Sequence, residues 1–322
     1  MPRLEDYVND VALGQLIETA RREDLGPAGI DATSTLFVDE SARGRAVIKC
    51  RQPGTVAGLA TLPRVVEAYD PHVKLLTVVE DGSAVEPGGV LAELEGPLAS
   101  ILQLERVALN LLGHLSGVAT HTAAFAQRIA GTSAKIYDTR KTLPGLRGLQ
   151  KYAVACGGGG THRMGLYDAV LIKDNHLAHL PLTDWPEALR DVVRRAYREL
   201  PDLKFIMVEV DTLEQLEAVL SVGEVAVTDL AGQAANPTRP AVDLVLLDNM
   251  SPPQLREAVR RRDAAATAGP PPHRPRVPGL EASGGVTLDT VADIAAAGVD
   301  RISVGAITHS SVNLDIGLDV VA

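Results

Sequence analysis

Apolar positions in the first hundred residues follow two different rhythms. Residues 4–25 repeat their apolar side chains at roughly helical intervals, which predicts one or two short amphipathic helices. From Asp31 onward, short apolar runs separated by proline and glycine predict β-strands. We expect these strands at 46–50, 54–60, 73–79 and 90–96. The pattern therefore predicts a β-rich, α/β sandwich-like domain that begins with helices.

Residues 100–130 have a strongly helical pattern, with leucine and valine repeating on one face. Within this run, the adjacent charges Glu105 and Arg106 favour an ordinary solvated helix face. Gly117 marks an expected break between two helices, because glycine is a poor helix former. We place the domain boundary there, with an N-terminal domain at 1–117 and a C-terminal domain at 118–322.

After residue 130, short apolar strands alternate with helical stretches such as 184–199 and 211–220. This alternation predicts a parallel sheet whose two faces are both covered. Strands are expected at 134–138, 168–172, 204–210, 224–228 (the weakest), 242–247, 280–282 and 301–304.

Charged residues or glycines stand where six of these strands end. They are Arg140 and Lys141, Lys173, Glu209, Asp248, Ser283 to Gly285, and Gly305. In a (β/α) barrel the carboxyl ends of all strands point to one face, where the active site is built. The chain is therefore expected to form a barrel of about six to seven parallel strands with a site at that face.

The segment between residues 135 and 173 is strongly basic, although the whole chain has a formal charge of −10. It holds seven lysines and arginines against two aspartates, with His162 beside them. A solvated surface mixes its signs, so this local excess indicates a site for a multiply charged anion. Four glycines at 157–160 add backbone that can bend tightly or approach a ligand closely. A flexible glycine loop between two basic helix faces is the alternative interpretation.

Two glycine turns late in the chain suit a phosphate. SGGV at 283–286 precedes a helix expected at 287–297, and GAI at 305–307 follows the last expected strand. Backbone N–H groups after the last two strands of a barrel commonly hold a phosphate. Ordinary strand-to-helix turn chemistry is the alternative for either turn alone. The segments at 231–240 and 268–279 are interpreted as surface insertions without chemistry.

Composition narrows the setting of the protein. An acidic balance argues against nucleic acid or a membrane surface as a partner, because both need a basic face. No apolar stretch reaches the roughly 18 residues needed to span a bilayer. Cys50 and Cys156 are far apart and lack metal-ligand spacing, which fits a reducing cytosol. The first ten residues lack the features of a signal peptide, so we expect a soluble cytoplasmic protein.

The stretch at 138–176 reads DTRKTLPGLRGLQKYAVACGGGGTHRMGLYDAVLIKDNH and is the most specific motif of the chain. Around it, in order along the chain, are ERVALNLLGHLSGVAT, VEVDTLEQ, LLDNM, LEASGGV and ISVGAITHS. Together these motifs resemble the quinolinate phosphoribosyltransferase family (nicotinate-nucleotide pyrophosphorylase, carboxylating). The similarity extends from about residue 10 to the C-terminus, and the insertions at 231–240 and 262–279 are departures from it.

The resemblance implies a β-rich N-terminal domain followed by an incomplete (β/α) barrel. It implies transfer of phosphoribosyl from phosphoribosyl pyrophosphate to quinolinate with decarboxylation, which gives nicotinate mononucleotide, pyrophosphate and CO2 in NAD biosynthesis. Mg2+ is the implied cofactor. The implied assembly is a homodimer, or a larger oligomer built from it, in which one subunit's N-terminal domain covers the partner's barrel.

The resemblance also assigns roles by motif position. Quinolinate would be bound by Arg106 from across the dimer interface and by Thr139, Arg140, Lys141, His162, Arg163 and Lys173. Phosphoribosyl pyrophosphate would be bound by Lys141, Lys173, Glu209, Asp248, Ser283, Gly284, Gly285, Gly305 and Ala306. Lys141, Lys173, Glu209 and Asp248 would carry catalysis, with Glu209 and Asp248 near Mg2+ directly or through water. This role for Arg106 replaces the solvated helix face as our interpretation.

Two alternatives predict different residues. A phosphoribosyltransferase acting on nicotinate, or the barrel paralogue found with molybdate transport, would lack part of the carboxylate-binding set, whereas Arg106, Arg140, His162 and Arg163 are all present. A non-catalytic regulator that binds a phosphorylated metabolite would keep the glycine turns but lose Lys141, Glu209 or Asp248. All three are present.

Overall fold

A computed structural model describes residues 1–200, 202–225, 239–267 and 276–321. These residues pack into two compact units, each assembled from separate segments of the chain. Unit 1 consists of Met1–Ala126, Lys141–Thr161 and Ala306–Ala322, and unit 2 consists of Gln127–Arg140 and His162–Gly305. The continuous division of the chain at residue 117 stays a prediction.

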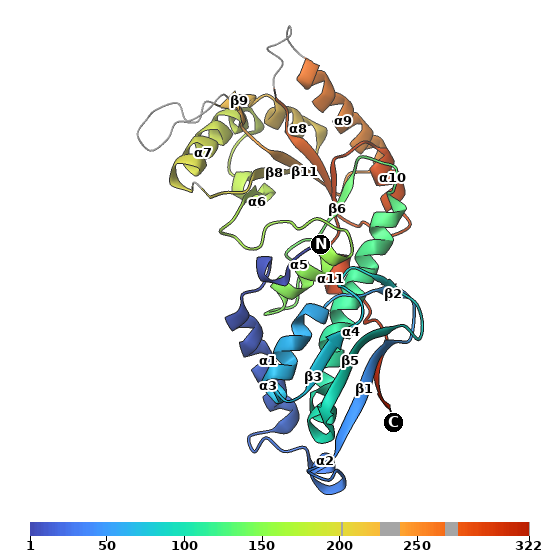
Figure 1. The fold of residues 1–322 in the computed structure, drawn as a ribbon. Coiled ribbons are helices and arrows are strands. Elements are labelled where there is room, and N and C mark those ends of the chain that lie inside the picture. The colour runs from blue at the N-terminus through green and yellow to red at the C-terminus, as the bar shows by residue number, and fades with distance from the viewer. Residues whose placement is uncertain (201, 226–238, 268–275, 322) are drawn as a thin grey trace. The chain divides into compact units, whose positions relative to one another are not determined.

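Unit 1 contains a four-stranded antiparallel sheet that a segment from the end of the chain completes. The strands lie in the order β14 (Ile316–Val321), β1 (Arg43–Cys50), β5 (Val90–Pro97) and β3 (Lys74–Thr77) (Figure 1). β14 pairs with β1 from Arg45 opposite Val321 to Cys50 opposite Ile316. The sequence pattern missed β14, because six residues with a single alternation give little periodic signal.

Helices pack beside this sheet. They include α1 (Asp10–Leu25), α3 (Leu62–Tyr69) and the longest, α4 (Leu98–Arg128), which is buried over much of its length. Asn9 caps α1 by accepting a hydrogen bond from the Ala12 N–H, as a first-turn donor requires. The shorter elements of unit 1 are η1 (Leu4–Asp6), α2 (Ala32–Phe37), β2 (Gly54–Thr55), η2 (Leu59–Thr61), β4 (Ala84–Val85), α5 (Arg147–Cys156) and α11 (Ala306–His309).

Most expectations for this region are confirmed. Residues 4–25 form η1 and α1, and strands form near 46–50, 73–79 and 90–96. The strand at 54–60 is wrong beyond Thr55, because the chain turns into η2 there. Two backbone N–H groups at the start of η2 donate to the Asp81 carboxylate, which holds this turn instead of a strand ladder.

The expected helix break at Gly117 is also wrong. Gly117 is buried inside one continuous helix, α4. The backbone at Val312 and Asn313 passes so close that a Cβ at Gly117 would overlap the carbonyl oxygen of Val312. Glycine is present there to allow two backbones to approach, not to interrupt the helix.

Unit 2 is built on six parallel strands. In spatial order they are β6 (Lys135–Tyr137), β13 (Arg301–Ser303), β12 (Gly279–Ser283), β11 (Leu244–Asp248), β8 (Ile206–Val210) and β7 (Val170–Ile172). Strands of this sheet that follow one another along the chain are therefore neighbours in space. The one exception is β6 and β7, which lie at opposite edges of the sheet. This is a (β/α) barrel left open at one junction, as the resemblance implied.

Contacts across the inner face demonstrate the curvature. The guanidinium carbon of Arg301, on β13, lies 5.6 Å from the ring centre of Phe205, which directly precedes β8. β11 and β12 separate these two strands, so a flat sheet would place them roughly 14 Å apart. The sheet must therefore curl, with Arg301 and Phe205 pointing inward.

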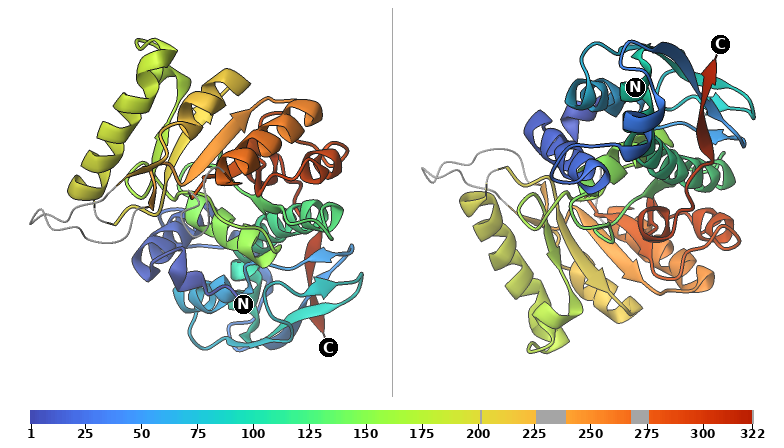
Figure 2. Two further views of the ribbon diagram at one scale, coloured as in Figure 1. Left: turned by 90° about the horizontal axis from the view of Figure 1, so that it is seen from above. Right: turned by 90° about the horizontal axis from the view of Figure 1, so that it is seen from below.

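The opposite face of the sheet is covered by helices (Figure 2). These include α7 (Trp185–Glu199), α8 (Leu213–Leu220), α9 (Pro252–Thr267) and α10 (Val291–Ala296), with shorter turns at α6 (Asp174–Leu177) and η3 (Leu182–Asp184). No helix in the described ranges is both long and apolar enough to cross a membrane.

Two expectations for unit 2 need correction. Residues 224–228 do not add a seventh strand to the barrel among the described residues: β9 (Glu224–Val225) pairs antiparallel with β10 (Arg239–Pro240) in a separate ribbon. The insertion expected at 262–279 begins later than residue 262, because α9 continues to Thr267 and Arg262 is bonded to Asp300. The rest of both insertions, at 231–238 and 268–275, lies outside the described residues.

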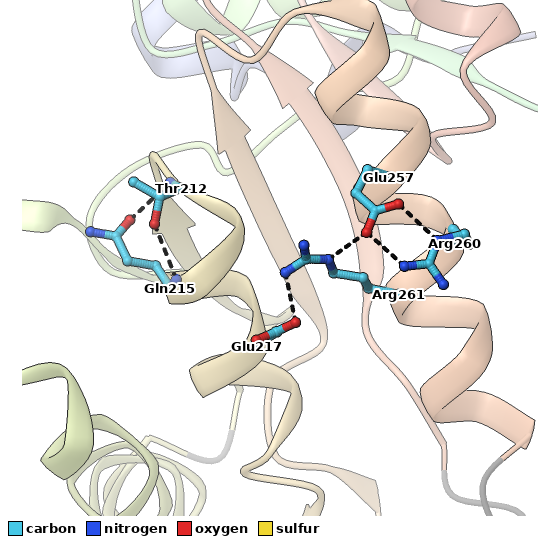
Figure 3. Close-up of polar contacts among 6 residues, drawn as sticks. All are labelled: Thr212, Gln215, Glu217, Glu257, Arg260 and Arg261. Atoms are coloured by element: carbon cyan, nitrogen blue, oxygen red, sulfur yellow. Dashed lines mark hydrogen bonds and ion pairs between the residues drawn. The ribbon is translucent and has the colours of Figure 1, made fainter.

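A polar network joins α8 and α9 on the outside of the barrel (Figure 3). Thr212 caps α8 through a reciprocal pair of bonds with Gln215. Arg261 of α9 binds Glu257 one turn earlier and reaches Glu217 of α8, at 2.8 and 2.6 Å. The arginines Arg260 and Arg261 together lower the pKa of Glu257 to about 2.

We expect Gly117→Ala to lower the free energy of unfolding by about 1–3 kcal/mol, because the new methyl group would overlap backbone. Gly14→Ala in α1 is the matched control, since its Cβ would meet only the movable end of Arg64 and alanine is the better helix former. Urea unfolding of both variants measures this. Equal effects of the two substitutions would contradict the close approach at Gly117.

Glu257 should contribute to stability in a pH-dependent way. Its pKa falls from the ordinary 4.5 to about 2 in the folded chain, so its contribution is full above about pH 4.5 and is lost as the pH falls towards 2. The difference in melting temperature between the protein and Glu257→Gln should therefore be largest near neutral pH. It should shrink as the pH falls towards 2. Glu187→Gln is the control, because the Glu187 side chain makes no hydrogen bond or ion pair within the described ranges. A gap that stays constant with pH would refute the assignment.

Candidate active site

The carboxyl edge of the parallel sheet brings predicted site residues together. Lys173 follows β7 and Glu209 lies on the adjacent β8, and the Lys173 Nζ donates to Glu209 Oε2 at 2.6 Å. Glu209 is nearly buried, whereas almost half of the Lys173 side chain is exposed. The pair therefore offers a substrate both a positive group, the Lys173 ammonium, and a negative group, the Glu209 carboxylate.

Further along the same edge, β11 and β12 end in an interlocked turn. Asp248 and Ser283 are paired in register, and Asn249 follows with the left-handed backbone angle φ 53°. Asn249 donates its side-chain N–H to Asp248 Oδ2 at 2.7 Å and its backbone N–H to the Ser283 oxygen at 2.9 Å. A Cβ at Gly284 would overlap the Asn249 side chain. Asn249 therefore contacts both Asp248 and the glycine turn, and links the positions of the two.

Sequence reasoning missed Asn249 as a site residue. The signal was present, because asparagine is one of few residues that adopt the left-handed region readily, and LLDNM places it directly after a buried strand. Backbone strain of this kind is found at functional sites.

Two arginines of the central motif influence each other. Burial lowers the pKa of Arg163, and the positive charge of Arg140 lowers it further, while Asp168 opposes both. Asp168 is itself buried, which would raise its pKa, but the N–H groups of Met164 and Gly165 and the Lys204 ammonium bring it below its ordinary value. Two guanidinium groups near each other favour an anion between or beside them.

His162 is oriented by the protein. Its backbone N–H donates to Asp138 Oδ1 at 2.6 Å, and its Nδ1 accepts from the Arg163 N–H at 2.8 Å. Its Nε2 lies 3.5 Å from Glu281 Oε1, and its ring meets Phe205 edge-on at 5.1 Å. Both ring nitrogens face protein atoms, so the structure gives His162 a supporting position, and its contact with quinolinate stays a prediction.

Beneath these residues lies a buried charge pair that the sequence pattern did not predict. Glu281 of β12 is 0% exposed, and Arg301 of the adjacent β13 places its Nε 2.8 Å from Glu281 Oε2. Arg301 stacks over the Tyr137 ring at 3.6 Å. Burial raises the pKa of Glu281, and Arg301 opposes that rise. Nothing in a strand such as GLEAS distinguishes an inward glutamate from a solvated one.

The basic segment is divided between the two units. Lys151 is fully buried in α5 of unit 1, while Arg140, Arg163 and Lys173 belong to unit 2. Within the glycine run, Gly157 and Gly159 pack closely on α4, because a Cβ at either position would overlap atoms of Ala119 or Thr122.

The remaining predicted residues have these positions. Thr139 is half-buried after β6, and Gly305 is half-buried after β13, both in unit 2. Gly285 is exposed with φ 60°. Lys141 is exposed, Ala306 opens α11, and Arg106 lies on α4 with its side chain 64% exposed and 3.9 Å from Glu105, all three in unit 1.

Glu209 and Asp248 are suitable donors for magnesium. Among the described residues no group of three or more His, Cys, Asp or Glu side chains is arranged to hold a metal ion. Magnesium is usually bound by one or two carboxylates together with substrate phosphates, and not by a cage made only of protein. A role for the two carboxylates in holding magnesium stays a prediction.

A parallel barrel with paired charges and glycine turns at its carboxyl edge defines an α/β-barrel enzyme that acts on anionic substrates. Models of the quinolinate phosphoribosyl transferase N-terminal and C-terminal domains match residues 31–116 and 118–319. The chain belongs to the quinolinate phosphoribosyltransferase family.

Individual relatives agree along the whole chain. A nicotinate-nucleotide pyrophosphorylase [carboxylating] of Mycobacterium leprae is 43% identical over 310 residues, which cover 94% of this chain and 95% of that protein. A nicotinate-nucleotide pyrophosphorylase structure from Francisella tularensis superimposes with a TM-score of 0.80 at 31% identity, covering 98% of each chain. One from Ehrlichia chaffeensis gives 0.77 at 34% identity, covering 98% of this chain and 99% of that one.

The turn at Gly284 offers a sharp test of the site. Gly284→Ala should raise the KM for phosphoribosyl pyrophosphate about tenfold or more, because the methyl group displaces Asn249 and with it Asp248. Gly285→Ala also places a side chain at a positive φ, 60° against 92° at Gly284, but in an open position, so its effect should be about threefold or less. Steady-state kinetics of both variants decide, and equal effects would show that strain alone matters.

Proposed function

We propose that this chain transfers the phosphoribosyl group of phosphoribosyl pyrophosphate to quinolinate and releases CO2 and pyrophosphate. The product is nicotinate mononucleotide, a precursor of NAD. Membership of the family supports this reaction. The observation that carries it is the joint presence of Lys173–Glu209 and Asp248–Ser283 at one edge of the barrel.

Quinolinate carries two carboxylates, which suit arginine because a guanidinium matches carboxylate oxygens in a bidentate fork. We assign these carboxylates to Arg140 and Arg163, with Thr139 and His162 supporting them and Arg106 supplied by a partner subunit. Lys141 and Lys173 lie between the two substrates in this assignment. The like charges of Arg140 and Arg163 support it, since an anion relieves their repulsion.

Phosphoribosyl pyrophosphate is assigned to the remaining strand ends. Ser283, Gly284, Gly285, Gly305 and Ala306 provide turns for its 5-phosphate, and the half-buried or buried carboxylates Asp248 and Glu209 face its ribose. Magnesium would be held by Glu209 and Asp248, directly or through water, and would neutralise charge on the pyrophosphate.

The chemistry needs few acid–base groups. Departure of pyrophosphate leaves positive character at ribose C1, which the Glu209 or Asp248 carboxylate stabilises as it develops. The pyridine nitrogen attacks C1 and becomes a pyridinium. The ring then accepts the electron pair of the bond to the adjacent carboxylate as CO2 leaves, and the resulting carbanion takes up a proton.

The assembly and the compartment are part of the proposal. Exposure of Arg106 supports a homodimer with a shared site, because a binding arginine on the surface needs a partner to complete its pocket. Cys50 and Cys156 are free thiols, both buried, which supports a reducing cytoplasm.

The direct experiment incubates the purified protein with phosphoribosyl pyrophosphate, magnesium and quinolinate, and in parallel with nicotinic acid. Formation of nicotinate mononucleotide with one CO2 per nucleotide from quinolinate is the expected result. Turnover of nicotinic acid instead would make the carboxylate assignment wrong. Turnover of neither substrate would favour the molybdate-associated paralogue or a binding protein.

Lys141→Ala should lower kcat about 100-fold while changing quinolinate affinity by less than about fivefold, because Lys141 acts by charge near the transferring group. Lys135→Ala is the control: it removes one charge of the same segment at the amino end of β6, away from the site. Single-turnover kinetics and direct quinolinate binding measure the two effects. An unchanged kcat would remove Lys141 from catalysis.

A further inference from the structure

A closed set of hydrogen bonds surrounds the segment that carries Lys141 in unit 1. The Thr308 hydroxyl donates to the Lys141 carbonyl oxygen at 2.9 Å. The Thr308 carbonyl oxygen accepts from Gln150 Nε2 at 2.8 Å. Gln150 Oε1 in turn accepts from the Leu143 N–H at 2.9 Å. These three bonds form a ring that starts and ends in the segment Lys141–Leu143.

The ring is buried, although the segment it holds is at the surface. Gln150 is 0% exposed and Thr308 is 2% exposed. The Gln150 amide also meets His114 Nε2 of α4 at 3.0 Å. The Gln150 and Thr308 side chains thus lie where water cannot readily replace a lost partner, so their bonds restrict the geometry more than fully exposed bonds would.

Within the same stretch, Arg147 Nε donates to the Thr142 hydroxyl and the Leu146 N–H donates to the Leu143 carbonyl oxygen. Residues 141–146 belong to neither a helix nor a strand, and the Lys141 side chain is exposed. Thr308 belongs to α11, which begins at Ala306 directly after Gly305. The ring therefore ties the backbone of the proposed catalytic lysine to the same short helix that carries the last glycine turn.

We propose that Thr308 and Gln150 are positioning residues for Lys141, and that they set its backbone so that its ammonium reaches the transferring phosphoribosyl group. This inference rests on the role of Lys141 proposed above. The bond to the Lys141 carbonyl fixes the backbone from which the side chain starts, and with it the region that the ammonium can reach. Displacements of about 1 Å in a catalytic group are costly.

The test deletes one bond without changing the shape of the side chain. Thr308→Val removes the hydroxyl that bonds Lys141 but keeps the volume, and it should lower kcat about tenfold with little change in the KM for quinolinate. Thr308→Ser retains the hydroxyl and should stay within about twofold of the parent protein.

Thr61→Val is the matched structural control. Thr61 is 0% exposed, and its hydroxyl also donates to a backbone carbonyl, that of Gly58, at 2.6 Å in the same unit. Melting temperatures of the Thr61 and Thr308 variants measure the loss of stability from each bond. The inference requires a loss of kcat for Thr308→Val alone, and equal losses for both variants would overturn it.

A double-mutant cycle with Lys141→Ala separates positioning from general damage. If Thr308 acts through Lys141, then Thr308→Val should have no further effect on kcat once Lys141 is alanine. If the fold-losses of kcat from the two single substitutions multiply in the double variant, the inference is overturned. A fall for Lys141→Ala without one for Thr308→Val would overturn it while leaving the proposed role of Lys141 intact. An unchanged kcat in Lys141→Ala would overturn both the inference and the proposed catalytic role of Lys141.

Discussion

Inside the barrel, Glu281 and Arg301 form a buried ion pair around which other side chains of unit 2 are arranged. A carboxylate without access to water is strongly unfavourable unless an opposite charge and hydrogen bonds match it. Arg301 reaches Glu281 from the neighbouring strand, and its planar guanidinium is covered by Tyr137 and Phe205. Phe205 can take part only because the sheet curls. The ion pair therefore lies on the inner face that the curvature of the sheet encloses.

The same carboxylate connects the floor of the barrel to its mouth. The His162 ring lies against Glu281 and at the same time accepts the backbone N–H of Arg163. The polypeptide that returns to unit 2 at residue 162 is thus fixed at its first two residues. Unit 2 therefore combines the buried carboxylate of Glu281 with the basic residues Arg140 and Arg163, although the chain as a whole is acidic.

The sequence predicted most of this architecture, because parallel strands buried on both faces leave a clear apolar pattern and their ends leave clear polar ones. It placed Lys173, Glu209, Asp248 and Ser283 at one edge, where they are found. It could not predict Glu281 or Asn249, because pairing and backbone strain depend on which strands are neighbours. The expected helix break at Gly117 was wrong for a related reason. A glycine that admits another backbone and a glycine that ends a helix look the same in one dimension.

Strand β14 has a consequence for synthesis of the protein. It is made last, yet it completes a sheet whose other strands end by Pro97. At about 5–20 residues per second, the ribosome needs on the order of ten to forty seconds to proceed from the end of β5 to the end of β14. During that interval one edge of β1 has no neighbour and can recruit a foreign strand. Nascent chains of this family member are therefore most in need of chaperone protection while the barrel is being translated.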